Sequence, residues 1–169
     1  MPGARAPVAL AVVVGTLVGS AVPAAADAEF VVTVSDGDLL ISVDRERAAL
    51  LPSVLAGARY AVTGSLGTLT VVDTRVGDPG WNAAGQVSSF VTGSGAVPGY
   101  PLSWTPEVLD HSSVQVLTVG SVVRGLGASR VLAVAGPAAG RGTARLTAGL
   151  EVLLPDPGET AAVLTITVI

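Results

Sequence analysis

The sequence contains no cysteine among its 169 residues. Disulfide bonds, thiolate metal sites, a catalytic thiol and attachment of a lipid to cysteine are therefore excluded. The sequence has one histidine, His111, and its nine basic residues are all arginine. Zinc sites draw mainly on histidine and cysteine ligands. With so few of these ligands, we expect no metal site and no cofactor.

Positive charge and aromatic side chains are also scarce. The net charge is −4 at pH 7, and aromatic residues make up 4% of the chain. Surfaces that bind nucleic acid concentrate positive charge on one face, and this sequence has no such cluster. The composition therefore indicates that nucleic acid is not a partner.

The first 28 residues have the order of a secretory signal peptide. Arg5 precedes an apolar run over residues 8–18, and small residues follow, ending in Ala26, Asp27 and Ala28. We expect cleavage after Ala28, with Ala26 as the alternative. The apolar run is shorter than the roughly 18 to 20 residues of a membrane-spanning helix. The sequence thus predicts a secreted protein, with a leader over residues 1–28, one domain over residues 29–169 and no transmembrane anchor in the mature chain.

Beyond residue 30, apolar and polar residues alternate with a period of two, which is typical of β-strands. The clearest cases are residues 143–154 (TARLTAGLEVLL) and 161–169 (AAVLTITVI). Residues 155–158 (PDPG) between them form a turn signal. We therefore expect these two strands to form an antiparallel hairpin.

Other strands are predicted by the same pattern. They cover residues 29–34, 38–43, 67–75, 81–90, 113–120 and 129–136. Gly37 is expected to take a positive φ in a tight turn between the first two. Residues 44–55 have a helix-like pattern that Pro52 interrupts, so we expect a strand exit and a loop there. Many short strands without helices predict an all-β fold, an antiparallel β-sandwich or flattened barrel with long loops.

The longest stretch without a clear pattern covers residues 91–113. We interpret it as a long loop on the β scaffold, and loops of this kind often carry binding residues. It contains Tyr100, Trp104 and His111. Tyr100 and Trp104 are therefore candidate ligand contacts.

Candidate catalytic residues are few. His111 lies between Asp110 and two serines, but neighbouring residues of an extended chain point in opposite directions, and no serine lies in a G-x-S-x-G motif. Asp36, Asp38 and Asp44 resemble part of a calcium loop without its bidentate glutamate, so an Asp-Gly turn explains them as well. We expect no catalytic residue and no enzyme. A wall hydrolase with two carboxylates brought together from distant strands remains a third class of function.

Two segments of the sequence share a pattern with a known family. A V-x-D-T-R segment containing Asp73 and Arg75 ends one predicted strand, Gly80 and Trp81 begin the next, and the chain closes on residues 164–169 (LTITVI). Together they resemble the WxL-domain family of secreted Gram-positive surface proteins. The resemblance covers roughly residues 30–169 and implies non-covalent attachment to the cell wall through peptidoglycan, often in complexes with other surface proteins.

The sequence departs from the family pattern at two positions. Ala83 stands where the first motif has leucine, and Ile166 stands where the second has tryptophan. A packed core tolerates isoleucine for tryptophan better than a sugar-stacking platform does. These departures therefore bear more on wall binding than on the fold.

Trp81 has two interpretations. Its indole either caps the end of the sandwich, with its N–H bound to a turn carbonyl, or lies on the surface and stacks on sugar rings. We favour the cap, and we keep Trp81 with Tyr100 and Trp104 as the candidate ligand contacts. Asp73 and Arg75 share a strand face, so Arg75 either fixes the turn through carboxylate and carbonyl contacts or forms a solvated pair with Asp73.

The sequence therefore favours a secreted, non-enzymatic surface module that binds the bacterial cell wall. The alternative is a structural or adhesive subunit whose partners are other surface proteins. Its basis is the uncharged C-terminal strand, residues 163–169, which would pair with another molecule if it lay at the edge of a sheet.

Overall fold

The computed structural model describes residues 10–14, 37–44, 48–50, 54–92, 95–97, 102–154 and 160–169. Every strand pairing within these ranges is antiparallel, and the same ranges contain no helix. The all-β class predicted from the alternating pattern is confirmed. The strands are β1 (Leu10–Val14), β2 (Leu39–Val43), β3 (Ala49–Leu50), β4 (Val54–Ala56), β5 (Arg59–Ser65), β6 (Leu69–Asp73), β7 (Trp81–Val87), β8 (Phe90–Thr92), β9 (Gly95–Val97), β10 (Leu102–His111), β11 (Leu117–Val119), β12 (Val123–Arg124), β13 (Arg130–Ala135), β14 (Gly142–Leu154), β15 (Thr160–Ala161) and β16 (Leu164–Val168).

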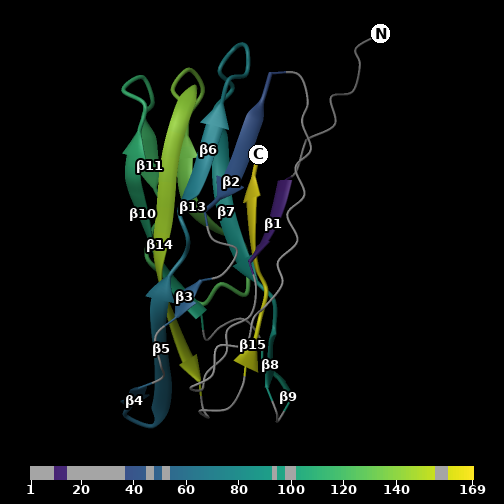
Figure 1. The fold of residues 1–169 in the computed structure, drawn as a ribbon, viewed down its shortest axis with the longest axis vertical. Helices are drawn as coiled ribbons and strands as arrows, with labels where there is room; N and C mark the ends of the chain where they lie inside the picture. The colour runs from purple at the N-terminus through teal and green to yellow at the C-terminus, as the bar shows by residue number, and fades with distance from the viewer. Residues whose placement is uncertain are drawn as a thin grey trace.

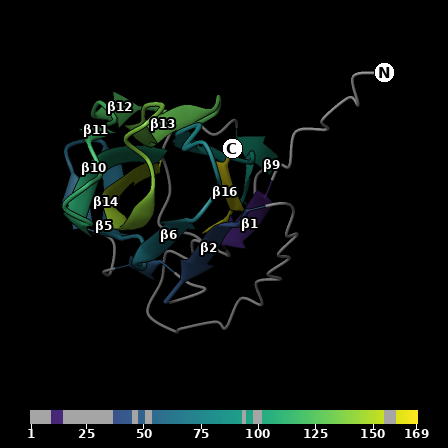
Figure 2. The same cartoon turned by 90° about the horizontal axis from the view of Figure 1, so that it is seen from above.

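The strands form two large sheets and one small one (Figure 1). Sheet A has the order β1-β16-β7-β13-β11 and curls into a half-barrel. Sheet B has the order β12-β10-β14-β5-β3, with β6 also on β14, β2 on β6 and β4 on β5. Sheet C consists of β15, β8 and β9. Seen from above, sheets A and B face each other around a common interior (Figure 2).

Strand β14 is the centre of sheet B. Its first residues pair with β6, its last residues pair with β5, and β10 pairs along its other side. The alternation read from the sequence buries one face, which carries Ala144, Leu146, Ala148, Leu150 and Val152. Each of these side chains therefore lies between the two sheets, where it removes apolar surface from water.

Trp104 joins the two sheets across the interior. It lies on β10 of sheet B and is 1% exposed. A Cβ atom at Gly85, on β7 of sheet A, would lie 2.5 Å from the Cη2 atom and 2.6 Å from the Cζ3 atom of this indole. The same Cβ would lie 3.0 Å from Cδ1 of Ile166 on β16. Gly85 therefore makes room for the indole at the sheet-to-sheet contact.

Two structural predictions were wrong. The strands at residues 143–154 and 161–169 do not form a hairpin, because β14 belongs to sheet B and β16 to sheet A. Residues 91–113 are not one long loop, because they include β9 and the ten-residue strand β10. Alternation shows which side chains share a face, but it does not show which strand lies alongside.

Several predictions fall outside the described residues. They are the cleavage positions Ala26 and Ala28, the strand at residues 29–34, Asp36, Tyr100 and the turn at residues 155–158. Gly37 is described and has a φ of +73°, as expected. Leu10–Val14 of the predicted leader is also described, and it forms the edge strand β1 beside β16.

Candidate functional site

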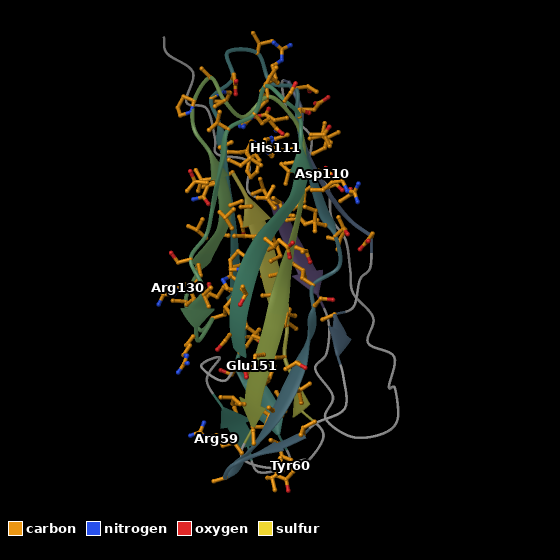
Figure 3. All side chains as sticks on the ribbon, turned by 90° about the vertical axis from the view of Figure 1, so that its left-hand side faces the viewer. Arg59, Tyr60, Asp110, His111, Arg130 and Glu151 are labelled. Carbon is orange, nitrogen blue, oxygen red and sulfur yellow. The ribbon has the colours of Figure 1, made fainter. Side chains whose placement is uncertain are left out.

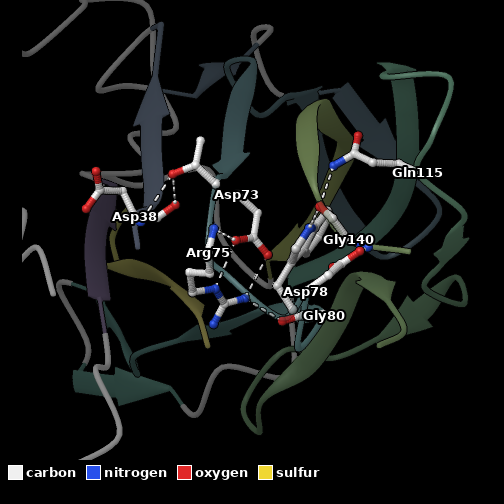
Figure 4. Close-up of polar contacts among 9 residues, drawn as sticks. Asp38, Asp73, Arg75, Asp78, Gly80, Gln115 and Gly140 are labelled. Carbon is white, nitrogen blue, oxygen red and sulfur yellow. Dashed lines mark hydrogen bonds and ion pairs between the residues drawn. The ribbon is translucent and has the colours of Figure 1, made fainter. Parts of the chain in front are cut away.

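The residues of the D-x-R and G-W motifs meet at one end of the sandwich (Figure 4). Asp73 ends β6 and is 0% exposed. Arg75 binds its carboxylate through two side-chain hydrogen bonds, from Nε to Oδ1 and from Nη2 to Oδ2, each 2.9 Å. The backbone N–H of Arg75 also donates to Oδ1 at 3.0 Å. The buried charge of Asp73 is thus paired and hydrogen-bonded, as burial of a carboxylate requires.

Arg75 also fixes the turn that leads to β7. Its Nη2 atom donates a hydrogen bond to the carbonyl oxygen of Gly80. The hydrogen bond with Asp73, followed by the charges of Asp73 and Asp78, raises the pKa of Arg75, although burial lowers it. The guanidinium therefore keeps its charge wherever the protein is folded at ordinary pH. This confirms the interpretation in which Arg75 holds the turn by carboxylate and carbonyl contacts.

Gly80 and Trp81 occupy positions that few other residues would fit. Gly80 has a φ of +79°, and a Cβ atom there would collide with the backbone of Ala135 and Gly136. Trp81 is 3% exposed, and its Nε1 donates to the carbonyl oxygen of Gly140 at 3.0 Å. Its interpretation as a cap with a carbonyl partner in the loop between β13 and β14 is confirmed.

Two further side chains bind the same loop. Gln115 is 3% exposed, and its Nε2 donates to the carbonyl oxygen of Gly140 at 2.7 Å. The backbone N–H of Gly140 donates to Oδ1 of Asp78 at 2.9 Å. We call the set Asp73, Arg75, Asp78, Gly80, Trp81, Gln115 and Gly140 the polar latch. It ties the β6–β7, β10–β11 and β13–β14 connections together, so the motif residues build the fold.

The structure removes both tryptophans from the list of ligand contacts. Trp81 and Trp104 are 3% and 1% exposed, so neither presents an indole face to a ligand. Trp104 lies on a strand and points into the core because it alternates with the exposed positions of β10. Its Nε1 has no hydrogen-bond partner in the described part of the chain. Tyr100 lies outside the described residues.

The remaining sequence candidates are not brought together. His111 and Asp110 lie at the exposed end of β10 (Figure 3), where Asp110 pairs with Arg145 at 3.1 Å. Asp38 and Asp44 lie at opposite ends of β2, and Oδ1 of Asp44 accepts a hydrogen bond from Thr68 N. Within the described ranges, no group of three or more histidine, cysteine or acidic residues could hold a metal ion.

A groove on the outer face of sheet A was not predicted from the sequence. It has a volume of about 250 Å³ and lies over β7 and β16, with the β12–β13 connection beside it. It is lined by Ala84, Gln86, Val87, Ser88, Ser129, Thr165 and Thr167. The sequence carried a partial signal, since Gln86 and Ser88 alternate along one strand and Thr165 and Thr167 along another. That these two strands are neighbours follows from the sheet order, which the sequence does not reveal.

The groove is polar without being charged. Four of its lining residues carry hydroxyl groups and one carries an amide. Gln86 Nε2 donates to the carbonyl oxygen of Gly127 at 3.0 Å, which joins the strand to the wall of the groove. A hydroxyl group both donates and accepts hydrogen bonds, so this lining suits a ligand that is itself rich in hydroxyl and amide groups.

The C-terminal strand is not an open edge in this chain. β16 pairs with β7 on one side and with β1 on the other, over five residue pairs on each side. Beyond β16, Ile169 and Asn82 exchange two backbone hydrogen bonds, of 2.9 and 3.1 Å. The edge expected from the sequence is therefore covered by Leu10–Val14 of the predicted leader.

Comparisons with known proteins give no family assignment. No family model, no curated protein and no solved structure matches this chain. In the described part of the chain, no helix has the length and apolar character needed to cross a membrane.

Proposed function

We propose that this protein is a secreted, non-enzymatic domain of the bacterial cell surface that binds wall glycan non-covalently through the groove on β7 and β16. The observation that carries the proposal is the lining of that groove. It places four hydroxyl groups and the amide of Gln86 on one outer face without a charged side chain among them. Peptidoglycan glycan strands are rich in hydroxyl and acetamido groups, which exchange hydrogen bonds with such a lining.

The resemblance to WxL domains supports the same proposal from the sequence side. The motif residues Asp73, Arg75, Gly80 and Trp81 all belong to the polar latch. Their buried contacts explain why a fold of this kind needs them in this order. In this proposal the motif residues stabilise the fold, and a separate surface of sheet A binds the glycan.

The binding test uses the secreted protein and purified peptidoglycan. The variant Thr165→Val/Thr167→Val removes two hydroxyl groups of the groove and keeps β-branched side chains in strand β16. Each lost hydrogen bond is worth about 1 kcal/mol, so we expect binding roughly tenfold weaker or more. The matched control is Thr63→Val/Thr70→Val in sheet B, on β5 and β6, which should bind as the parent does.

Co-sedimentation with increasing amounts of peptidoglycan gives the bound fraction. Retention of the parent protein no higher than that of an inert protein of similar net charge would reject the proposal. Equal loss in the groove variant and in the control would place binding elsewhere on the surface.

The second candidate, an adhesive subunit with protein partners, is favoured by strand β16. Residues 160–169 contain no charged side chain. β1 covers this strand in the full chain, so β16 becomes an edge strand only once the predicted leader is removed. Edge strands of monomeric proteins usually carry charges, prolines or bulges that block pairing with another chain.

A further inference from the structure

The pairing of β16 with β7 determines which backbone N–H and C=O groups of β16 point toward its outer edge. Ile169 and Asn82 exchange both of their hydrogen bonds, and Thr167 and Thr165 follow at two-residue steps opposite Ala84 and Gln86. In an antiparallel pair, residues alternate between facing the partner and facing away. The N–H and C=O groups of Leu164, Ile166 and Val168 therefore point away from β7, toward the position that β1 occupies.

Strand β1 lies wholly within the predicted leader. Its five residues pair with Leu164–Val168, from Leu10 opposite Val168 to Val14 opposite Leu164. Cleavage after Ala28 or Ala26 would take β1 away and leave the backbone groups of three β16 residues without these partners. An unpaired row of such groups next to apolar side chains is a template for another strand.

The residues of β1 show what kind of strand fits there. Read in the same direction, β1 is LAVVV and β16 is LTITV. The first residue is leucine in both and the last is valine in both, and the middle residue is valine in one and isoleucine in the other. A second copy of β16 therefore offers nearly the same residues at the three positions that oppose Leu164, Ile166 and Val168.

We propose that, once the leader is removed, the outer edge of β16 pairs antiparallel with β16 of a second copy of this chain. The two-fold axis passes beside Ile166, so that each Ile166 lies opposite the other. Leu164 of one copy then lies opposite Val168 of the other, and Thr165 lies opposite Thr167. All three inward residues of each copy expose their backbone groups to the shared edge, so the hydrogen-bond pattern is satisfied on both sides.

Three other edge strands of the large sheets are less suited to this pairing. β11, at the far edge of sheet A, is three residues long, and β12 in sheet B is two. β2 is five residues long but is bracketed by Asp38 and Asp44. The β16 edge combines five residues with the absence of charge, and threonine pairs directly opposite each other are favourable in sheets.

The first test compares two forms of the protein by sedimentation. One is the protein recovered after export, with its N-terminus established by mass spectrometry, and the other is the unprocessed 169-residue chain. A pair of five-residue strands is a small interface, so the series extends to roughly millimolar protein. We expect the exported form to reach about twice the mass of one chain with rising concentration, and the unprocessed form to remain monomeric.

The second test changes the charge of the paired threonines. In the proposed register, Thr165→Lys/Thr167→Lys places lysines directly opposite each other, and Thr165→Glu/Thr167→Glu does the same with glutamates. Like charges opposite each other are unfavourable and opposite charges are favourable. Each variant alone should therefore stay monomeric, and an equal mixture should recover the two-chain species. The control Thr63→Lys/Thr118→Lys, at exposed strand positions elsewhere, should associate as the parent does.

Three outcomes would overturn the proposal. The first is an exported form that stays monomeric while the amides of Leu164, Ile166 and Val168 remain protected from hydrogen exchange, which would show that another segment of the same chain covers the edge. The second is a monomer in which these amides exchange freely. The third is a two-chain species that the charged variants leave unchanged. Glycan binding is measured separately, so failure here leaves the proposed function standing, and the reverse also holds.

Discussion

At the scale of single residues, Asp73 and Arg75 of the short sequence motif form a buried, hydrogen-bonded ion pair. The carboxylate is fully buried, and Arg75 satisfies it with two side-chain hydrogen bonds and a backbone one. Removing one partner of a buried pair leaves the other charge uncompensated. The spacing of two left two interpretations open, a turn held by Arg75 and a solvated pair with Asp73, and the structure shows the first.

Arg75→Ala should therefore lower the free energy of unfolding by about 3 to 5 kcal/mol, because the buried carboxylate loses its counter-charge. Arg145→Ala is the matched control. Arg145 pairs with Asp110, but both side chains are half-exposed, so its loss should cost less than about 1 kcal/mol. Urea denaturation followed by tryptophan fluorescence measures both. Equal costs for the two variants would contradict the role given to the buried pair.

The pH dependence follows from the sign of the Arg75 shift. Its pKa is raised in the folded state, chiefly by the hydrogen bond with Asp73. A raised pKa of a cationic group contributes stability at every pH below the pKa of the unfolded state, and the contribution is lost only as the pH rises through the pKa of the folded state. The stability difference between the parent and Asp73→Ala/Arg75→Ala should thus stay constant from about pH 6 to about pH 10. A steady decline of this difference over that range would contradict the assignment.

The two buried tryptophans differ in one respect that mutation can measure. Trp81 Nε1 has an acceptor in Gly140, whereas Trp104 Nε1 has no partner in the described part of the chain. Trp81→Phe loses a hydrogen bond, and Trp104→Phe removes an unsatisfied donor. We expect Trp81→Phe to be the more destabilising by about 1 to 3 kcal/mol, as measured by thermal unfolding. The opposite order would show that ring volume outweighs the hydrogen bond.

The sequence predicted Trp81 better than Trp104 for a physical reason. Trp81 follows a glycine-containing turn and starts a strand, so the sequence favoured a capping position in which the indole N–H binds a carbonyl oxygen. Trp104 lies in a stretch with Pro106, Glu107 and Asp110, which looked like a loop. β10 pairs with β14 on one side, with one irregularity between Val108 and Asp110, and pairs with β12 at two residues on the other side. Within the described residues, most of β10 has no neighbouring strand on that second side, so proline, which has no backbone N–H to donate, is accommodated there.

At the scale of elements, Trp104 of β10 packs closely against Gly85 of β7 where the two sheets face each other. Gly85→Ala would place a Cβ atom 2.5 to 2.6 Å from Cη2 and Cζ3 of Trp104. Overpacking of this kind typically costs about 1 to 3 kcal/mol. Phenylalanine lacks the second ring that carries these two atoms. Gly85→Ala should therefore cost less in the Trp104→Phe background than in the parent, and a double-mutant cycle by urea denaturation measures the difference.

If the free-energy costs of Gly85→Ala and Trp104→Phe were simply additive, the close contact between these two residues would be contradicted. A matched control is Gly149→Ala on β14, where an added Cβ would lie 3.9 Å from Thr105 Cβ, an ordinary van der Waals distance. Its cost should be independent of residue 104.

The positions of many strands could be predicted from the sequence, but the strands with which they pair could not. Leu146, Leu150 and Ile166 fall on buried faces as the alternation predicted. Whether β14 continues into β16 by a hairpin or crosses to the other sheet depends on which arrangement buries both faces, and a local turn signal carries no information about that. The groove was missed for the same reason, because Gln86 and Thr165 become neighbours only when β7 and β16 pair.

At the scale of the whole molecule, one end of the sandwich, its interior and its outer face have different roles. The polar latch closes one end by joining three connections around Gly140. The interior is filled by apolar residues of both sheets and by the two indoles. The outer face of sheet A carries the uncharged groove, and its β16 edge lies beside that groove. The proposed glycan binding thus lies on the outer face of sheet A, and the motif residues stabilise the fold that supports this face.

The most direct test of this proposal is a nuclear magnetic resonance titration of the isotope-labelled protein with soluble peptidoglycan fragments. The account predicts that the largest chemical-shift changes occur at Gln86, Ser88, Ser129, Thr165 and Thr167, while the Trp81 and Trp104 indole signals change little. Shift changes confined to other surfaces, such as the connection that carries Val114 and Val116, or no changes at saturating fragment concentration, would contradict it.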